Sequence, residues 1–177
     1  MLMFHFVKRE LETLTIHRFS SATMPVARLW VNCLYYWGLC GGLIGYFLFH
    51  PDFPDAGHPP VHDLMYASLF LMFETLNFNT HIILRNLRPE GSKKRGIPKG
   101  AGFSLVSCAN YMWELCAWGT FALFSECFAA YIFLVTATMI LVKWAQERHR
   151  QYLKEFDGRG GREKYPAGRT ALIPFLL

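Results

Sequence analysis

The chain has 177 residues, of which 53% are hydrophobic and 16% aromatic, and its formal net charge is +5. Every lysine and arginine lies in one of three segments, 1–28, 85–99 and 143–177. A soluble protein spreads its charges over the whole surface, and a nucleic-acid-binding protein gathers them on one face. Clearing cations from two long blocks is typical of a membrane protein, because a cation in hydrocarbon is costly.

The apolar blocks predict the helices in chain order. A span needs about 20 apolar residues, and residues 29–49 and 64–84 each meet that length, with a proline-rich loop free of lysine and arginine between them. Residues 103–142 form about two further spans, joined by a tight hairpin near residues 125–127. Residues 1–6 are expected to be the end of another helix.

The basic segments predict the orientation. The positive-inside rule places all three of them in the cytosol and both uncharged turns on the other side. We therefore expect an all-α, polytopic membrane helix bundle with about four transmembrane helices and a partial N-terminal helix. Residues 1–177 are expected to form a single membrane domain, in keeping with the length of the chain.

The cysteines and histidines predict no metal site and no disulfide framework. The five cysteines lie in apolar stretches, their number is odd, and none forms a CxxC pair. Such cysteines are expected to be small packing residues. His58 and His62 have too few partner residues nearby for a di-iron centre, which argues against a hydroxylase or a desaturase.

Polar residues recur at helical spacing inside two of the expected spans. Glu74, Asn77, His81, Arg85 and Arg88 are three or four residues apart and form one stripe of the second span. Such groups either satisfy one another between helices or line a polar cavity. The two arginines at one end favour a cavity that opens to the cytosol and takes an anionic ligand.

The third span carries a second stripe. Asn110 and Glu114 are four residues apart and share a face, with Tyr111 beside them. Both stripes contain a carboxylate in a segment that is expected to lie in lipid. Intramembrane carboxylates usually face a bundle interior or a water-filled cavity, so the stripe is better explained as the wall of a polar cavity than as contacts between helices.

Several strings, taken in order along the chain, closely resemble the steroid 5-alpha-reductase superfamily. They are residues 8–13 (KRELET), 17–20 (HRFS), 23–25 (TMP), 77–88 with Gly91 and 97–98 (IP), 110–114 (NYMWE), 152–156 (YLKEF) and 171–175 (ALIPF). Within it, the first two strings are similar to the branch of very-long-chain trans-2-enoyl-CoA reductases. Nearly the whole chain is covered by the resemblance.

The resemblance implies a multi-pass endoplasmic-reticulum enzyme that uses NADPH to saturate the 2,3 double bond of a long-chain enoyl-CoA. It would act in very-long-chain fatty-acid elongation, beside other membrane enzymes of the elongase complex. The site residues carried over for NADPH are Asn77, His81, Arg85, Arg88, Arg95, Asn110, Glu114 and Tyr152. Tyr111 would donate the proton, with Lys8 near the mouth of the pocket as an electrostatic helper.

Longer members of this branch have further helices ahead of the KRELET string, whereas here Met1 stands seven residues before Lys8. Two alternatives therefore stay open. One is a catalytically silent, truncated scaffold of the elongase complex. The other is a membrane methyltransferase of the isoprenylcysteine type, which has a similar cytosolic pocket and would bind S-adenosylmethionine.

Overall fold

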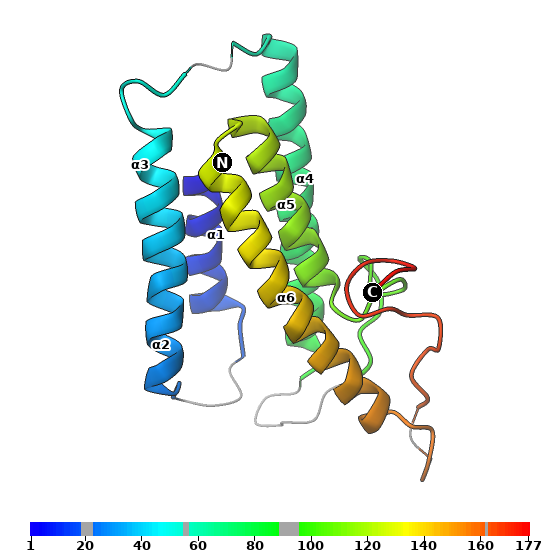
Figure 1. Ribbon diagram of the computed structural model, residues 1–177. Coiled ribbons are helices and arrows are strands. Elements are labelled where there is room, and N and C mark those ends of the chain that lie inside the picture. The colour runs from blue at the N-terminus through cyan, green and yellow to red at the C-terminus, as the bar shows by residue number, and fades with distance from the viewer. Residues whose placement is uncertain (19–22, 55–56, 89–95, 162) are drawn as a thin grey trace.

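The computed structural model describes residues 1–18, 23–54, 57–88, 96–161 and 163–177, and over these residues the fold is all-helical (Figure 1). The elements are α1 (Leu2–Thr15), α2 (Val26–Cys33), the π-helix η1 (Leu34–Ile44), α3 (Gly45–Leu48), α4 (Pro60–Asn86), α5 (Ala109–Ser125) and α6 (Phe128–Glu155). In the described ranges no strand is formed, and the β-type pairing is limited to two isolated bridges, Val106–Thr170 and Asp157–Lys164. The expected all-α class is confirmed.

Two helical segments are long and apolar enough to cross a membrane. One is the continuous segment Val26–Leu48, formed by α2, η1 and α3, and the other is α6. Only 11% and 28% of their most apolar windows are buried, so most of their apolar surface faces outward. That exposure is unlike the core helix of a soluble protein, and it fits a lipid environment.

Four membrane spans were expected, and the two that correspond to α4 and α5 are not confirmed. The span expected at 64–84 lies within α4, whose polar stripe lowers its hydropathy. The third expected span is α5, which has 17 residues. It begins at Ala109 rather than near Phe103, because residues 103–108 form turns and Val106 makes a β-bridge with Thr170. The backbone groups of this segment that pair with the C-terminal segment are not available to a helix.

The hairpin expected near residues 125–127 is confirmed. Helix α5 ends at Ser125, Glu126 adopts a left-handed conformation with φ of 49°, and α6 begins at Phe128. The two helices then pack along buried alanines of α6, namely Ala129, Ala130 and Ala137. Small residues let helix backbones approach closely, which is how helices associate in lipid.

The start of α5 is fixed by the C-terminal segment, which lies beside it in Figure 1. The backbone N–H groups of Ser107 and Cys108 donate to the carbonyls of Thr170 (2.8 Å) and Ala171 (3.1 Å). The N–H of Thr170 donates in turn to Leu105 O at 3.2 Å. Parts of the chain more than 60 residues apart thus hold the first turn of α5 in place.

Helix α1 extends well beyond the six residues expected to be helical. It continues to Thr15, and its side chains contact η1, α4 and α5. The helix continues past residue 6, because the charged residues Lys8, Arg9 and Glu12 lie on the face turned toward α4. The structure thus extends the predicted N-terminal helix to 14 residues, with His5 and Glu12 buried.

Candidate active site

Helix α4 turns its polar stripe into the bundle. Glu74 and Asn77 are each 1% exposed and His81 is 7% exposed. The stripe extends to Arg88, which is also buried and lies just past the end of the helix. The sequence prediction that these residues share one interior face is therefore confirmed. Buried groups of this kind need partners, and most of the partners come from α1.

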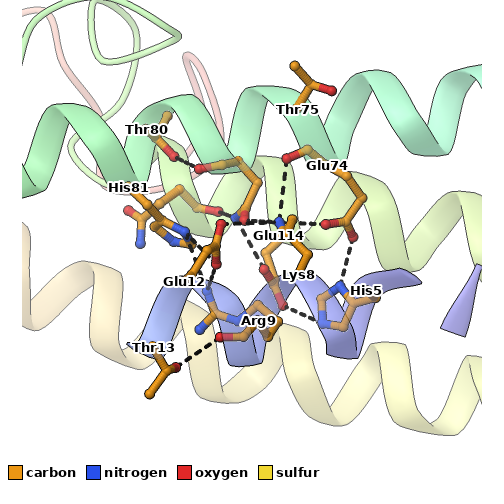
Figure 2. Close-up of polar contacts among 12 residues, drawn as sticks. His5, Lys8, Arg9, Glu12, Thr13, Glu74, Thr75, Thr80, His81 and Glu114 are labelled. Carbon is orange, nitrogen blue, oxygen red and sulfur yellow. Dashed lines mark hydrogen bonds and ion pairs between the residues drawn. The ribbon is translucent and has the colours of Figure 1, made fainter. Parts of the chain in front are cut away.

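Three charged side chains of α1 meet this stripe, as Figure 2 shows. The Lys8 ammonium donates to Asn77 Oδ1 at 2.6 Å and pairs with Glu74 Oε2. Arg9 Nη1 donates to Glu12 Oε2 at 2.8 Å, and the same carboxylate oxygen lies 3.0 Å from His81 Nδ1. Helices α1 and α4 are thus joined by a buried ionic network, hereafter the α1–α4 network.

His5 extends the network to α5. Its Nδ1 lies 2.7 Å from Glu74 Oε1 and its Nε2 lies 3.4 Å from Glu114 Oε1. The imidazole of His5 therefore lies between a carboxylate of α4 and a carboxylate of α5. His5 thus links the α1–α4 network to a third helix.

Glu114 is surrounded by donors. Besides His5, Asn77 Nδ2 donates to its Oε2 at 3.1 Å and Trp118 Nε1 donates to its Oε1 at 3.4 Å. Asn77 Nδ2 also donates to the backbone carbonyl of Asn110 at 2.9 Å. The two stripes expected from the sequence therefore meet, and Asn77 is the residue that joins them.

A group of four arginines lines a cavity at the end of the stripes where α4 terminates. This cationic chamber has a volume of about 370 Å³. Its polar lining residues are Arg9, His17, Arg18, His81, Arg85, Arg88, Asn110, Tyr111 and Tyr152. Arg18 and Arg88 are held in place by each other's backbone carbonyls. Cationic, partly buried walls of this kind suit a ligand with phosphate groups.

A second cavity, of about 310 Å³, adjoins the first and reaches toward the middle of the bundle. Its apolar wall comes from α2 and α6, and its polar residues include Asn77, Glu114 and Lys143. We call it the acyl chamber, after the ligand proposed for it below. Arg9, His81, Asn110 and Tyr111 line both chambers, so the two cavities meet at these four side chains.

The structure brings together most of the site residues that the sequence predicted. Those that line the cationic chamber, the acyl chamber or both are Asn77, His81, Arg85, Arg88, Asn110, Tyr111, Glu114 and Tyr152. Arg95 lies outside the described residues. Lys8 lines neither chamber, because its ammonium is held inside the α1–α4 network. Its predicted place near the mouth of the pocket is not what the structure shows.

Sequence reasoning missed His5, Arg9 and Glu12 as members of the site. Their spacing contained the signal, since positions 5, 8, 9 and 12 recur at three or four residues and so share one helix face. The helix expected from the sequence covers only residues 1–6, so this spacing is not part of the prediction. A polar stripe on α1, matched to that on α4, would have found them.

Glu12, His17 and His81 present three ligand atoms that all lie within 4.8 Å of one another. Geometry alone would admit a metal ion there. However, Arg9 donates to the Glu12 carboxylate and its Nη1 also lies 3.4 Å from His81 Nδ1. A divalent cation would have to enter beside this guanidinium and the arginines of the cationic chamber, which electrostatic repulsion opposes.

His17 lies beyond the end of α1 and gives the fold a pH dependence. Burial, followed by the nearby positive charges of His81 and Arg9, lowers the pKa of His17 from 6.5 to about 4. Between about pH 6.5 and pH 4, the unfolded chain therefore binds a proton at His17 more readily than the folded chain does. Stability should be complete above about pH 6.5 and should fall as the pH falls toward 4.

We expect His17→Asn to flatten that dependence, as measured by thermal unfolding in detergent from pH 7.5 to 4.5. His50→Asn is the matched control, because His50 lies at the opposite end of α2–α3 and lines neither chamber. An unchanged slope in His17→Asn, or an equal flattening in the control, would contradict the assignment of this pH dependence to His17.

Tyr152 is fixed at the wall of the cationic chamber by the C-terminal segment. Its ring stacks on that of Tyr165, with centroids 5.4 Å apart and planes 8° apart. The Tyr165 hydroxyl lies 2.7 Å from Ser107 Oγ, which lies 2.6 Å from His149 Nδ1. The same segment thus orients both α5 and the chamber wall on α6.

Comparison with known proteins agrees with this geometry. A very-long-chain enoyl-CoA reductase of Dictyostelium discoideum is 42% identical over 173 residues, which are 98% of this chain and 55% of that protein. A Caenorhabditis elegans protein named "Probable very-long-chain enoyl-CoA reductase art-1" is 39% identical over 180 residues, which cover 98% of this chain and 56% of that protein. The chain thus spans little more than half the length of these relatives.

The family model described as 3-oxo-5-alpha-steroid 4-dehydrogenase matches residues 22–177. That range contains both polar stripes and most of the residues that line the two chambers, whereas Arg9, His17 and Arg18 lie before it. The chain therefore belongs to the 3-oxo-5-alpha-steroid 4-dehydrogenase family, the steroid 5-alpha-reductases, as its sequence motifs predicted.

Proposed function

We propose that this chain carries the reducing site of an NADPH-dependent enoyl-CoA reductase. Its substrate would be a long-chain trans-2-enoyl-CoA, and the reaction would complete a cycle of very-long-chain fatty-acid elongation. The observation that carries the proposal is the junction of the two chambers. A cavity suited to phosphates and a cavity with an apolar wall share Asn110 and Tyr111, so a cofactor and an acyl chain can meet there.

The residues of the cationic chamber fit the proposed cofactor. NADPH carries a pyrophosphate and a 2′-phosphate, and Arg18, Arg85 and Arg88 would bind these groups through charge-assisted hydrogen bonds. Tyr152 offers an aromatic face at the same wall. The nicotinamide end would then lie near Asn110 and Glu114, where, when bound, the cofactor supplies the hydride.

Tyr111 is proposed as the proton donor. As C3 of the enoyl thioester accepts hydride, electron density moves to the thioester carbonyl oxygen, and C2 must then receive a proton. Tyr111 lines both chambers, so its phenol can reach a substrate carbon beside the cofactor. A positioned phenol in a site of low dielectric constant is suited to that transfer.

The cellular setting is part of the proposal. The exposed apolar surfaces of Val26–Leu48 and α6 support a bilayer as the surroundings. We place the protein in the endoplasmic reticulum membrane as a multi-pass protein, with the cationic chamber open to the cytosol, where NADPH and acyl-CoA are available. Other membrane enzymes of the elongase complex would be its partners.

The test is NADPH oxidation by membranes that contain this chain, supplied with a long-chain trans-2-enoyl-CoA. Turnover with formation of the saturated acyl-CoA would support the proposal. NADPH binding without turnover would mean that part of the catalytic machinery lies in other segments. Stabilisation by S-adenosylmethionine in place of NADPH would favour the methyltransferase, and stabilisation by neither would favour the silent scaffold.

We expect Arg85→Gln to weaken NADPH binding by about tenfold or more, since a hydrogen bond to a charged group contributes roughly 1.5–3 kcal/mol. Arg85 lines the cationic chamber at the end of α4. The dissociation constant can be measured by fluorescence titration at fixed ionic strength. Arg150→Gln is the matched control, because Arg150 is an exposed residue of α6 that lines neither chamber. Equal affinities in the two variants would refute this role of Arg85.

A further inference from the structure

Tyr35 stands on the wall of the acyl chamber opposite α5. It is the second residue of the π-helix η1, whereas Tyr111 and Glu114 of the facing wall belong to α5. A side chain from η1 can therefore approach a ligand in this chamber from the side that α5 does not reach. The function of Tyr35 in the site depends on what its hydroxyl can bind.

The Tyr35 hydroxyl has no hydrogen-bond partner among the described residues, and the contacts of this side chain are made by its ring. A phenol beside an apolar core normally finds an acceptor. The hydroxyl is also not among the fully enclosed, unpaired polar atoms of the described residues. It is therefore accessible from the chamber, where a ligand can supply the missing acceptor.

The polar groups of Asn77 on the far wall, by contrast, are already used. Its amide donates to Asn110 O and Glu114 Oε2, and its Oδ1 accepts from Lys8. Both carboxylate oxygens of Glu114 likewise already accept hydrogen bonds, from Asn77 and from Trp118. A carbonyl oxygen in this chamber would find an unused donor at Tyr35.

The ring of Tyr35 is held rigidly. It packs on Phe133, which is 1% exposed, at a centroid distance of 4.7 Å, and meets Tyr36 edge-on at 4.9 Å. The π-helical backbone contributes to this arrangement. Its wider turn rotates successive side chains by roughly 80° instead of about 100°, so Tyr35 and Tyr36 can both line the chamber. π-Helical segments are frequent at functional sites.

We propose that the Tyr35 hydroxyl donates a hydrogen bond to the thioester carbonyl oxygen of the substrate, an inference that rests on the proposed function. Hydride adds to C3, the π electrons shift to the carbonyl oxygen, and Tyr35 stabilises that enolate oxygen while keeping its own proton. The proton that reaches C2 comes from Tyr111. Tyr35 is thus a catalytic residue that also selects for a thioester carbonyl.

Binding tests this assignment without relying on turnover. Trp118 and Trp144 line the chamber, so quenching of tryptophan fluorescence reports its occupation. The probes are a saturated long-chain acyl-CoA and the matching S-alkyl-CoA thioether, in which a methylene group replaces the carbonyl. Wild-type protein should bind the thioester about three- to tenfold more tightly than the thioether, as expected for one neutral hydrogen bond.

Tyr35→Phe should abolish this preference, because it weakens the binding of the thioester and leaves the binding of the thioether unchanged. The kcat of this variant for enoyl-CoA reduction should fall by about 100-fold or more, as for removal of an oxyanion donor. Tyr46→Phe is the matched control, since Tyr46 lies in α3, is 64% exposed and lines neither chamber. The melting temperature of each variant verifies that the fold is kept.

A preference for the thioester that persists in Tyr35→Phe would overturn the assignment, as would its loss in Tyr36→Phe instead. Absence of binding by both probes would contradict this assignment and the acyl chamber alike. Binding with the expected preference but without turnover of an enoyl-CoA would count against the proposed function alone. The two proposals can therefore fail separately.

Discussion

Tyr111→Phe is expected to lower kcat for enoyl-CoA reduction by roughly 100- to 10,000-fold, the usual contribution of a positioned general acid. The NADPH dissociation constant should change by less than about twofold, because the arginines of the cationic chamber remain. The reason is the position of Tyr111 at the junction of the two chambers. Steady-state kinetics and a fluorescence titration of NADPH measure the two quantities.

Tyr131→Phe controls for the loss of a phenol elsewhere in the bundle, since Tyr131 is an exposed residue of α6 that lines neither chamber. Its kcat should match that of the wild type. Should Tyr111→Phe keep full turnover, Tyr111 is not the donor. A solvent isotope effect on kcat in the wild type would report the proton transfer and not the hydride transfer, because only the transferred proton exchanges with solvent.

Lys8→Met should reduce the free energy of unfolding by about 3–5 kcal/mol, the effect of removing one partner from a buried ion pair. Among the described residues, two enclosed carboxylate oxygens of the network, Glu12 Oε1 and Glu74 Oε2, face the Lys8 ammonium and no other donor. Without that cation they remain buried, charged and unpaired. Denaturant-induced unfolding in mild detergent measures the loss.

The charge origin of this effect can be isolated with a second substitution. The double variant Lys8→Met/Glu74→Gln removes a cation and a carboxylate together. Its loss in free energy of unfolding should therefore be smaller than the sum of the losses of the two single variants. Lys99→Met is the surface control, because its pair with Glu163 at 3.0 Å is 70% and 58% exposed and should contribute at most about 1 kcal/mol. Equal losses for Lys8 and Lys99 would refute the buried network.

Much of the site followed from helical spacing alone. A residue three or four positions along a helix returns to the same face, so the stripes of α4 and α5 could be read from the positions of Glu74, Asn77, His81, Asn110 and Glu114. The hairpin at Ser125 likewise followed from length, because the 40 residues 103–142 are about twice as long as a single membrane span. The family was evident from the order of the short motifs.

The sequence by itself thus determined the helix class, the charge segregation and the residues of each stripe, since these depend on neighbours along one helix. Only the tertiary structure decided which stripes face each other. Lys8 was expected near the pocket mouth, yet it lies within the α1–α4 network, because Glu12 and Glu74 come together only when α1 packs on α4. The junction of the two chambers at Tyr111, and the phenol of Tyr35 opposite it, also arise from packing between distant segments. Spacing along one helix carries no information about such contacts.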